Sequence, residues 1–438
     1  MKTTLQKCLF LGMLVILLSS SCASAYQAVP TPTVTPAPSP TFTHPPPYKV
    51  LSPEDMRSDL DELFRQIEKH HPDPYAKRSK EDVNRDRQAL YKELDQPLTI
   101  VEFYRKLEPL ITSLGDNHTR VFPPPDTRDE MYAHERLLPF EIEFEGERAF
   151  ITANYTENPD IPLGSELITI DETPLSSILP DAGAYKFLDL GWYLWFLHGS
   201  VPEYKISIVP AGGNTPVELT VPGVTLNQIS QQTTELPVEE VTYNTLPNEK
   251  IGILTLNDFM SIYEPVKKAF EQIQKDGVQD LIIDIRGNHG GHIESLDLFM
   301  NYLTDQPYQK CYKCALNRPW DNVSNRYHGN IYLLIGPYTH SAAVLLANIL
   351  QDHQLATLVG EETAETSSFC GNVIIGGEPL PRTGLKYMVS GECYVRPNGI
   401  VDGRGVIPDM IVETTIDDMI TGNDPVLDYT LELIRNGQ

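Results

Sequence analysis

The stretch that decides the fold runs from residue 281 to residue 291 and reads LIIDIRGNHGG. Its first half is a short apolar run of the kind found in strands that are buried on both faces. Its second half contains three glycines, which allow backbone N–H groups to approach a ligand at close range. The stretch therefore predicts a core strand that ends in a loop with accessible amide groups.

Similar units surround this stretch from residue 250 onward. Apolar strands and helical patterns alternate over residues 251–256, 264–277, 331–336, 340–353 and 355–360. Such alternation is typical of a parallel sheet that is covered by helices on both faces. We therefore expect an α/β domain over residues 246–438.

The preceding residues predict two further segments. Residues 52–115 carry apolar side chains at helical spacing, which favours a helical N-terminal domain over residues 48–135. Residues 136–245 alternate between apolar and polar positions, with glycine, proline and asparagine breaks, and predict a small β-rich module. Within this module, residues 161–179 resemble the part of a PDZ-like domain in which a glycine turn precedes a strand and a short helix.

The composition excludes several classes of protein. The 438 residues are 41% apolar and 21% charged, which is incompatible with a wholly disordered or fibrous chain. The chain carries 34 basic and 60 acidic residues, and its formal net charge is −26. This negative charge would repel a nucleic acid, and no run of basic residues offsets it, so we expect no nucleic-acid partner.

Residues 1–25 have the pattern of an export signal, with Lys2 and Lys7 before a short apolar core. Two endings fit the pattern. Cleavage after Ala25 would release a secreted protein, whereas lipidation of Cys22 would anchor the chain to a membrane as a surface lipoprotein. Residues 26–47 contain eight prolines and predict an extended linker between the export signal and the folded body.

Four cysteines lie outside the export signal: Cys311, Cys314, Cys370 and Cys393. In an exported protein an even set of cysteines favours disulfides over a zinc site. Cys370 and Cys393 flank a stretch that has the pattern of a hairpin, so we expect these two to pair. Cys311 would then pair with Cys314 or remain as a reducible link.

Ser341 is the candidate nucleophile, because it follows the strand 331–336 at the predicted start of a helix. The positive end of the helix dipole and the amides of the glycine loop would stabilise an oxyanion there. A base is needed as well, and residues 342–385 contain no lysine, which disfavours a pairing of Ser341 with Lys386. The histidines His118, His289, His292 and His340 are the candidate bases. We expect the His340 side chain to point away from that of Ser341, because the two are adjacent on a helix.

Five motifs together resemble those of the tail-specific (C-terminal processing) serine peptidases, most closely the tricorn-type branch that uses serine and histidine. The motifs are LGDNHTR (114–120), LIIDIRGNHGG (281–291), THSAAVLLANILQ (339–351), LVGEETAE (358–365) and GRGVIPDM (403–410). The resemblance implies a ClpP/crotonase-like catalytic core with a helical N-terminal cap and a β-rich, PDZ-like module.

The resemblance also implies a role for individual residues. Ser341 matches the nucleophile, and His118 matches the general base. Asn117 and Asp402 stand where that branch carries a serine and a glutamate. The implied oxyanion hole consists of amides of Gly290 or Gly291 and of Ala342. No metal and no organic cofactor is implied.

The predicted function is therefore that of an exported serine endopeptidase or carboxyl-terminal processing protease, which acts on peptide or protein substrates through an acyl-enzyme. One alternative is a non-catalytic surface lipoprotein that binds peptides or other ligands on the same scaffold. An esterase of the α/β-hydrolase class is disfavoured, because the sequence lacks the G-x-S-x-G motif of that class.

Overall fold

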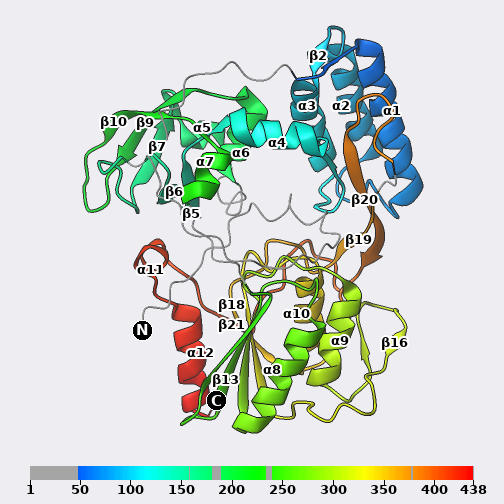
Figure 1. Cartoon of the computed structure of the whole chain (residues 1–438), viewed down its shortest axis with the longest axis vertical. Helices are drawn as coiled ribbons and strands as arrows, with labels where there is room; N and C mark the ends of the chain where they lie inside the picture. Colours follow the sequence, from blue (N-terminus) through cyan, green and yellow to red (C-terminus); the bar gives the residue numbers. More distant parts are fainter. Residues whose placement is uncertain (1–47, 157, 180–188, 233–238, 376–377, 438) are drawn as a thin grey trace, which may run out of the picture.

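The computed structural model describes residues 48–156, 158–179, 189–232, 239–375 and 378–437. The expected export signal, the linker and Cys22 lie outside these residues. Figure 1 shows a layer of helices and a β-rich module side by side, with an α/β body below both of them. The expected mixed α/β fold is thereby confirmed. Among the described residues, no helix has the length and apolar character needed to span a membrane.

The helical layer begins with the three helices that the sequence predicts. These are α1 (Pro53–His70), α2 (Lys80–Glu93) and α3 (Ile100–Thr112), and α4 (Pro125–His134) follows them. Ser52, Ser79 and Thr99 each accept a hydrogen bond from a backbone N–H of the first turn, which fixes the three helix starts. The short strands β1 (Val50–Leu51) and β2 (Leu98–Thr99) pair beside these helices.

The β-rich module is an antiparallel sheet with the strand order β10-β9-β7-β6-β5, and β8 pairs with β7. Its strands are β5 (Phe140–Glu145), β6 (Arg148–Asn154), β7 (Glu166–Ile170), β8 (Thr173–Pro174), β9 (Glu203–Val209) and β10 (Val217–Pro222). Helices α5 (Leu175–Ile178), α6 (Leu190–His198) and α7 (Leu226–Gln232) and the pair β4 (Arg136–Leu137) and β11 (Val224–Thr225) complete this region.

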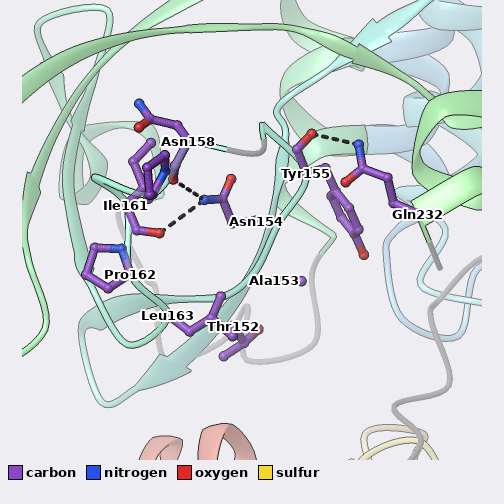
Figure 2. A pocket seen from close by; sticks show the side chains of 10 residues that line it. Thr152, Ala153, Asn154, Tyr155, Asn158, Ile161, Pro162, Leu163 and Gln232 are labelled. Carbon is purple, nitrogen blue, oxygen red and sulfur yellow. Dashed lines mark hydrogen bonds between the residues drawn. The ribbon is translucent and has the colours of Figure 1, made fainter. Parts of the chain in front are cut away.

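The β-rich module contains a pocket of about 530 Å³ (Figure 2). It is lined by residues 152–154 of β6, by Tyr155, by the loop residues 158, 159 and 161–163, and by Gln232. The Asn154 side chain donates hydrogen bonds to the carbonyls of Asn158 and Ile161, at 3.1 and 3.0 Å. These bonds hold the loop against the strand. Among the lining residues that the structure describes there is no serine, cysteine, histidine or acidic residue, so these residues offer no nucleophile with a base.

The α/β body is a six-stranded sheet with the order β12-β13-β14-β17-β18-β21. Its strands are β12 (Val241–Leu246), β13 (Ile251–Leu256), β14 (Asp280–Asp284), β17 (Asn330–Ile335), β18 (Thr357–Gly360) and β21 (Met410–Ile411). All neighbours are parallel except the edge pair β12 and β13. Strand β12 alternates like the strands of the module, which is why the sequence pattern placed nearly all of it upstream of residue 246.

Helices cover both faces of this sheet, as expected. The larger core lies beneath α8 (Tyr263–Asp276), α9 (Ile293–Leu303) and α10 (Ala342–Asp352). The smaller core lies beneath α12 (Pro425–Arg435), which is drawn in red on the opposite side in Figure 1. The remaining short elements are β15 (Tyr308–Gln309), β16 (Leu316–Asn317) and α11 (Ile416–Thr421).

A long hairpin connects the α/β body to the helical layer. It consists of β19 (Phe369–Ile375) and β20 (Lys386–Tyr394), and β20 also pairs with β3 (Arg120–Phe122) of the helical layer. The buried carboxylate of Asp59 on α1 accepts hydrogen bonds from the backbone N–H groups of Arg382 and Thr383 in the connecting loop. The hairpin thus fixes the start of β3, and the turn just before it, relative to the sheet.

Both expected cysteine pairs lie at bonding distance. Cys370 and Cys393 are direct partners across β19 and β20, and their Cα atoms are 3.9 Å apart. Cys311 pairs with Cys314, which leaves neither thiolate free to bind zinc. The hairpin that the sequence predicts between Cys370 and Cys393 is therefore confirmed.

Removing the Cys370–Cys393 disulfide is expected to weaken the attachment of the hairpin. Closure of a loop with a sequence separation of 23 residues stabilises a fold by about 3 kcal/mol. A Cys370→Ala, Cys393→Ala variant should lose about this amount in urea unfolding. The Cys311→Ala, Cys314→Ala variant is the control, because its loop spans only three residues and its loss should be smaller. Equal losses in the two variants would contradict the expectation.

Candidate active site

Ser341 occupies the sharp turn between β17 and α10. Its backbone has φ 55° and ψ −119°, a region that non-glycine residues rarely adopt. The residue stands immediately before α10 rather than within its first turn, and its side chain makes no capping hydrogen bond. Strain of this kind costs about 1–3 kcal/mol and is found mostly at functional sites. The turn leaves the hydroxyl free to meet a base from another element.

His118 is in position to act as this base, because its Nε2 atom lies 3.0 Å from Ser341 Oγ. The two residues are 223 positions apart and come from the helical layer and the α/β body. Burial lowers the pKa of the His118 imidazole, while the Asp116 carboxylate and the backbone of Cys370 partly offset this effect. His118 is therefore neutral near pH 7 and can accept a proton from Ser341.

Asp116 fixes the turn that carries His118. Its Oδ1 atom accepts a hydrogen bond from the His118 backbone N–H at 3.0 Å, and its Oδ2 atom accepts bonds from Thr119 and Ser390. His71 Nε2 lies 2.9 Å from the same Oδ2 atom. Burial alone would raise the pKa of Asp116, but these hydrogen bonds outweigh it and lower the pKa to about 2. The charged carboxylate thus anchors the histidine turn to β20.

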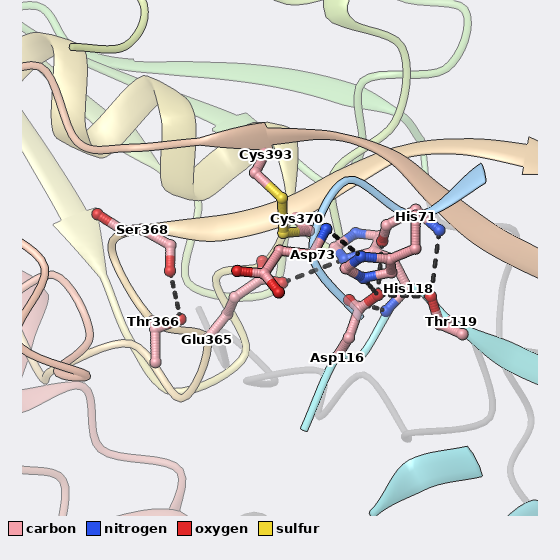
Figure 3. The surroundings of a disulfide bond; sticks show 11 residues. His71, Asp73, Asp116, His118, Thr119, Glu365, Thr366, Ser368, Cys370 and Cys393 are labelled. Atoms are coloured by element: carbon pink, nitrogen blue, oxygen red, sulfur yellow. Dashed lines mark hydrogen bonds and ion pairs between the residues drawn. A yellow bond between two sulfur atoms is a disulfide. The ribbon is translucent and has the colours of Figure 1, made fainter. Parts of the chain in front are cut away.

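Glu365 is the third polar group at the contact between Ser341 and His118, and the sequence alone did not predict it as a site residue. Its Oε1 atom lies 3.4 Å from His118 Nδ1, and its Oε2 atom accepts a hydrogen bond from the backbone N–H of Ser341. Figure 3 shows its carboxylate facing the His118 ring, beside the Cys370–Cys393 disulfide. Only 3% of Glu365 is exposed, and burial raises its pKa to about 8, with the Ser341 N–H opposing and the Asp116 charge adding to the rise.

The motif LVGEETAE does contain this glutamate, at its last position. The motif resemblance assigns the third catalytic position to Asp402 and no role to Glu365. Two acidic residues precede Glu365 in the motif, and Glu361 is buried as well, so the sequence alone does not show which of the three faces His118. Only the loop after β18, which turns Glu365 inward, distinguishes it.

Asp402 and Asn117, which the motifs predict as site residues, do not contact Ser341 or His118. Asp402 is exposed, and its carboxylate accepts a hydrogen bond from the backbone N–H of Arg404, which is the turn role that acidic residues often have. Asn117 is exposed, and its side chain has no hydrogen bond to any residue that the structure describes. Its neighbour His118 points inward, so Asn117 points outward from the same turn. The expected catalytic roles of Asp402 and Asn117 are therefore wrong for this geometry.

His340 also lies at the site, contrary to the expectation that it would point away. Its ring stacks on the His118 ring with 5.1 Å between centroids, and its Nε2 atom is 3.2 Å from Glu365 Oε1. The expectation assumed a helical backbone at Ser341, whereas the positive φ of Ser341 turns the two side chains toward one region. Burial, together with the neighbouring His118 and His289, lowers the pKa of His340 well below 6.5.

The glycine loop after β14 supplies the candidate oxyanion donors. The N–H of Gly290 already donates to Asn288 Oδ1 at 2.8 Å, so Gly290 is not one of them. The N–H groups of Gly291 and Ala342 have no hydrogen-bond acceptor within the described part of the chain. These two amides remain available to an oxyanion, which narrows the predicted set of Gly290, Gly291 and Ala342 to the last two.

Gly290 acts through its missing side chain instead. A Cβ atom there would lie 2.5 Å from Ser341 Cβ and 2.9 Å from the Ala342 nitrogen, and the φ of Gly290 is +91°. Gly290→Ala should therefore displace the serine and slow its reaction with a fluorophosphonate probe by at least about tenfold. Gly403→Ala is the matched control, because Gly403 also has a positive φ but no atom within 4 Å. Equal labelling rates in both variants would contradict this prediction.

Residues 250–412 match the model of peptidase family S41. This part of the chain is similar to peptidase family S41. The S41 match includes the strand and loop of residues 281–291, Ser341 and Glu365, whereas His118 lies upstream of it. The resemblance that the motifs suggested is thereby confirmed.

Curated relatives of the S41 domain have related names. The chain is 29% identical over 169 residues to a carboxyl-terminal-processing protease of Synechocystis, which covers 37% of each chain. It is 24% identical over 194 residues to a tail-specific protease of Haemophilus influenzae, covering 42% of this chain and 28% of the relative. It is 24% identical over 232 residues to a probable CtpA-like serine protease of Staphylococcus aureus, covering 50% and 44%. The chain thus spans less than half the length of each relative.

The wider fold around the S41 domain is also found in a solved structure. The crystal structure of mature CPAF superposes with a TM-score of 0.61, covering 87% of this chain and 97% of CPAF. The identity is 16%, so the similarity concerns the fold. It extends beyond the S41 domain to most of the helical layer and the β-rich module.

Proposed function

We propose that this protein is a serine peptidase in which Ser341 is the nucleophile, His118 the general base and Glu365 the group that orients His118. The observation that carries the proposal is the 3.0 Å contact between His118 Nε2 and Ser341 Oγ, with Ser341 inside the residues that match the S41 model. Acyl transfer requires a nucleophile, a neutral base that contacts it and an acidic group that contacts the base. Ser341, His118 and Glu365 are arranged in this order.

The reaction follows from these contacts. Neutral His118 accepts the hydroxyl proton as Ser341 Oγ attacks a peptide carbonyl, and the amides of Gly291 and Ala342 donate to the resulting oxyanion. The imidazolium then gives its proton to the leaving amine. Glu365 Oε1 faces Nδ1 of His118, so the negative charge that Glu365 carries above about pH 8 favours the imidazolium. In the second half of the reaction, His118 accepts a proton from a water molecule as that water attacks the acyl carbonyl. His118 then returns the proton to Ser341 Oγ as the ester bond breaks and the acid product leaves.

The test is covalent labelling of the full chain with a fluorophosphonate. The wild-type protein should be modified at Ser341, identified by mass spectrometry of the labelled peptide, and Ser341→Ala should remain unlabelled. The same sample should release fragments from an unstructured protein substrate. Binding of that substrate without labelling or cleavage would instead support the alternative, a non-catalytic peptide-binding protein.

The proposal has a finer structural part. We propose that the α/β body is a ClpP/crotonase-like core and that the β-rich module of residues 136–245 is PDZ-like and holds the substrate. The names of the curated relatives favour substrates cut near their carboxyl terminus. Cleavage of one peptide with a free and with an amidated carboxyl terminus would test this preference, because only the free form carries the terminal charge.

The location of the protein is part of the same proposal. The export signal over residues 1–25 and the two disulfides favour an oxidising, extracytoplasmic environment. Lipidation of Cys22 and free secretion are distinguished by Cys22→Ala, which releases the protein from the membrane fraction only if the lipid anchor exists.

A further inference from the structure

His118, His340 and Glu365 form a cluster with the ligand types of a zinc site. One potential ligand atom from each lies within 4.8 Å of the other two, and two histidines with one glutamate are a known zinc ligand set. The peptidase mechanism does not use His340, whose Nε2 atom nevertheless faces Glu365. The cluster therefore contains a histidine that acyl transfer does not require.

The distances fit a tetrahedral ion. Zinc bonds of about 2.0–2.1 Å place neighbouring ligand atoms of a tetrahedron about 3.3 Å apart. Glu365 Oε1 lies 3.4 Å from His118 Nδ1 and 3.2 Å from His340 Nε2. The oxygen and the two nitrogens thus already have the spacing that zinc would impose on two edges of the tetrahedron.

The His118 Nδ1 atom is the second, independent observation. It is buried and lacks a well-formed hydrogen bond to any described residue, and 8% of His118 is exposed. The nearest carboxylate oxygen, Glu365 Oε1, is 3.4 Å from this atom, and a metal ion between the two would bind both. On the other side, the backbone of His289 accepts a hydrogen bond from the His340 ring, as partners of metal-binding histidines commonly do.

We propose that His118, His340 and Glu365 form an inhibitory binding site for Zn²⁺. The ion would bind Nδ1 of His118, Nε2 of His340 and the Glu365 carboxylate, with the fourth position open to water. The ion is not a cofactor of the peptidase in this proposal; it switches the peptidase off.

The inhibition follows from the tautomer of His118. With Zn²⁺ on Nδ1, the imidazole proton moves to Nε2, so His118 remains neutral but donates toward Ser341 instead of accepting its proton. Glu365, where protonated, releases its proton to water as it binds the ion. Zn²⁺ and proton transfer from Ser341 are therefore mutually exclusive.

The inference of inhibition rests on the proposed function, but binding of Zn²⁺ can be measured without it. The full chain, treated with chelator and kept free of reductant, is titrated with ZnCl₂ by calorimetry, and fluorophosphonate labelling is measured in parallel. We expect one Zn²⁺ per chain at this site, at least about tenfold slower labelling when it is bound, and full recovery after chelation.

His340→Gln removes one ligand and should weaken Zn²⁺ binding by at least about tenfold. His134→Gln is the matched control: His134 also lies 3.3 Å from a carboxylate, that of Glu130, but on the surface of α4 and without a second histidine. It should bind Zn²⁺ like the wild type. Melting temperatures establish that the variants are folded, and if His340→Gln is not, Glu365→Gln tests the same site with little change in side-chain volume.

Each outcome decides one question. Equal Zn²⁺ affinity in the wild type and in the ligand variants, or no binding at all, would overturn the metal site. Binding that depends on His340 in a protein that never labels would leave the site standing and overturn the peptidase. Labelling that proceeds unchanged with the site filled would overturn inhibition.

Discussion

Ser341→Ala should reduce the peptidase activity by a factor of about 10⁴ to 10⁶, and His118→Ala should reduce it nearly as far. The reason is the 3.0 Å contact, which makes the hydroxyl and the imidazole one proton-transfer unit. The double variant should therefore be hardly slower than either single variant. Initial rates of cleavage of a fluorogenic peptide, followed over hours for the weakest variants, measure all three.

Lys386 is the control for the alternative base. It is exposed on β20 and pairs in register with Phe122 of β3, so Lys386→Ala should leave turnover almost intact. An essential Lys386 together with a dispensable His118 would refute the Ser–His pair. Additive losses in the double variant would mean that the two groups act independently.

Glu365→Gln should reduce kcat by a factor of about 10² to 10⁴ at pH values above about 8, whereas Asp402→Asn should change it little. Glutamine keeps the size of the side chain and its contact with the Ser341 N–H but cannot carry the charge that favours the His118 imidazolium. Asp402 is the matched control because it is an exposed acidic residue whose carboxylate serves a turn. A greater loss in Asp402→Asn would reverse the assignment.

The pH profile of the same variant separates a charge effect from a structural one. In buffer with chelator, kcat/KM of the wild type should rise as His118 loses its proton, at a pKa below 6.5 because burial lowers it. A second rise should follow near pH 8, where burial has moved the pKa of Glu365 and where its ionisation begins to favour the imidazolium. Glu365→Gln should retain the first rise and lose the second. Two rises in the variant would show that another group titrates.

Much of the fold follows from local pattern. Strand β13 has the bounds predicted from its apolar run, and α1 begins after Ser52 because serine followed by proline is a strong helix start. Ser341 and His118 were also found, since one lies at a strand-to-helix junction and the other in a motif of a known family. Both features can be recognised in short stretches of sequence, so predicting Ser341 and His118 requires no knowledge of distant contacts.

Glu365, the third residue of the site, can be identified only from contacts between residues that are far apart in the sequence. Glu365 differs from Glu361 and Glu362 only in what surrounds it. The packing of the loop after β18 decides which carboxylate contacts His118 and His340. The inward position of His340 depends on the positive φ of Ser341, which the surrounding structure imposes against local preference. Asp402 was chosen by its place in a motif, and that place turned out to be a surface turn.

The hairpin that joins β3 to the α/β body also determines when the chain acquires its activity. The base enters the chain early, the nucleophile comes 223 residues later, and β20, which fixes the base, follows only at residues 386–394. During synthesis, an N-terminal fragment that already contains both groups still lacks the strand that brings them into register. A chain that ends before residue 386 would therefore contain Ser341 and His118 without the strand that holds the histidine turn in place.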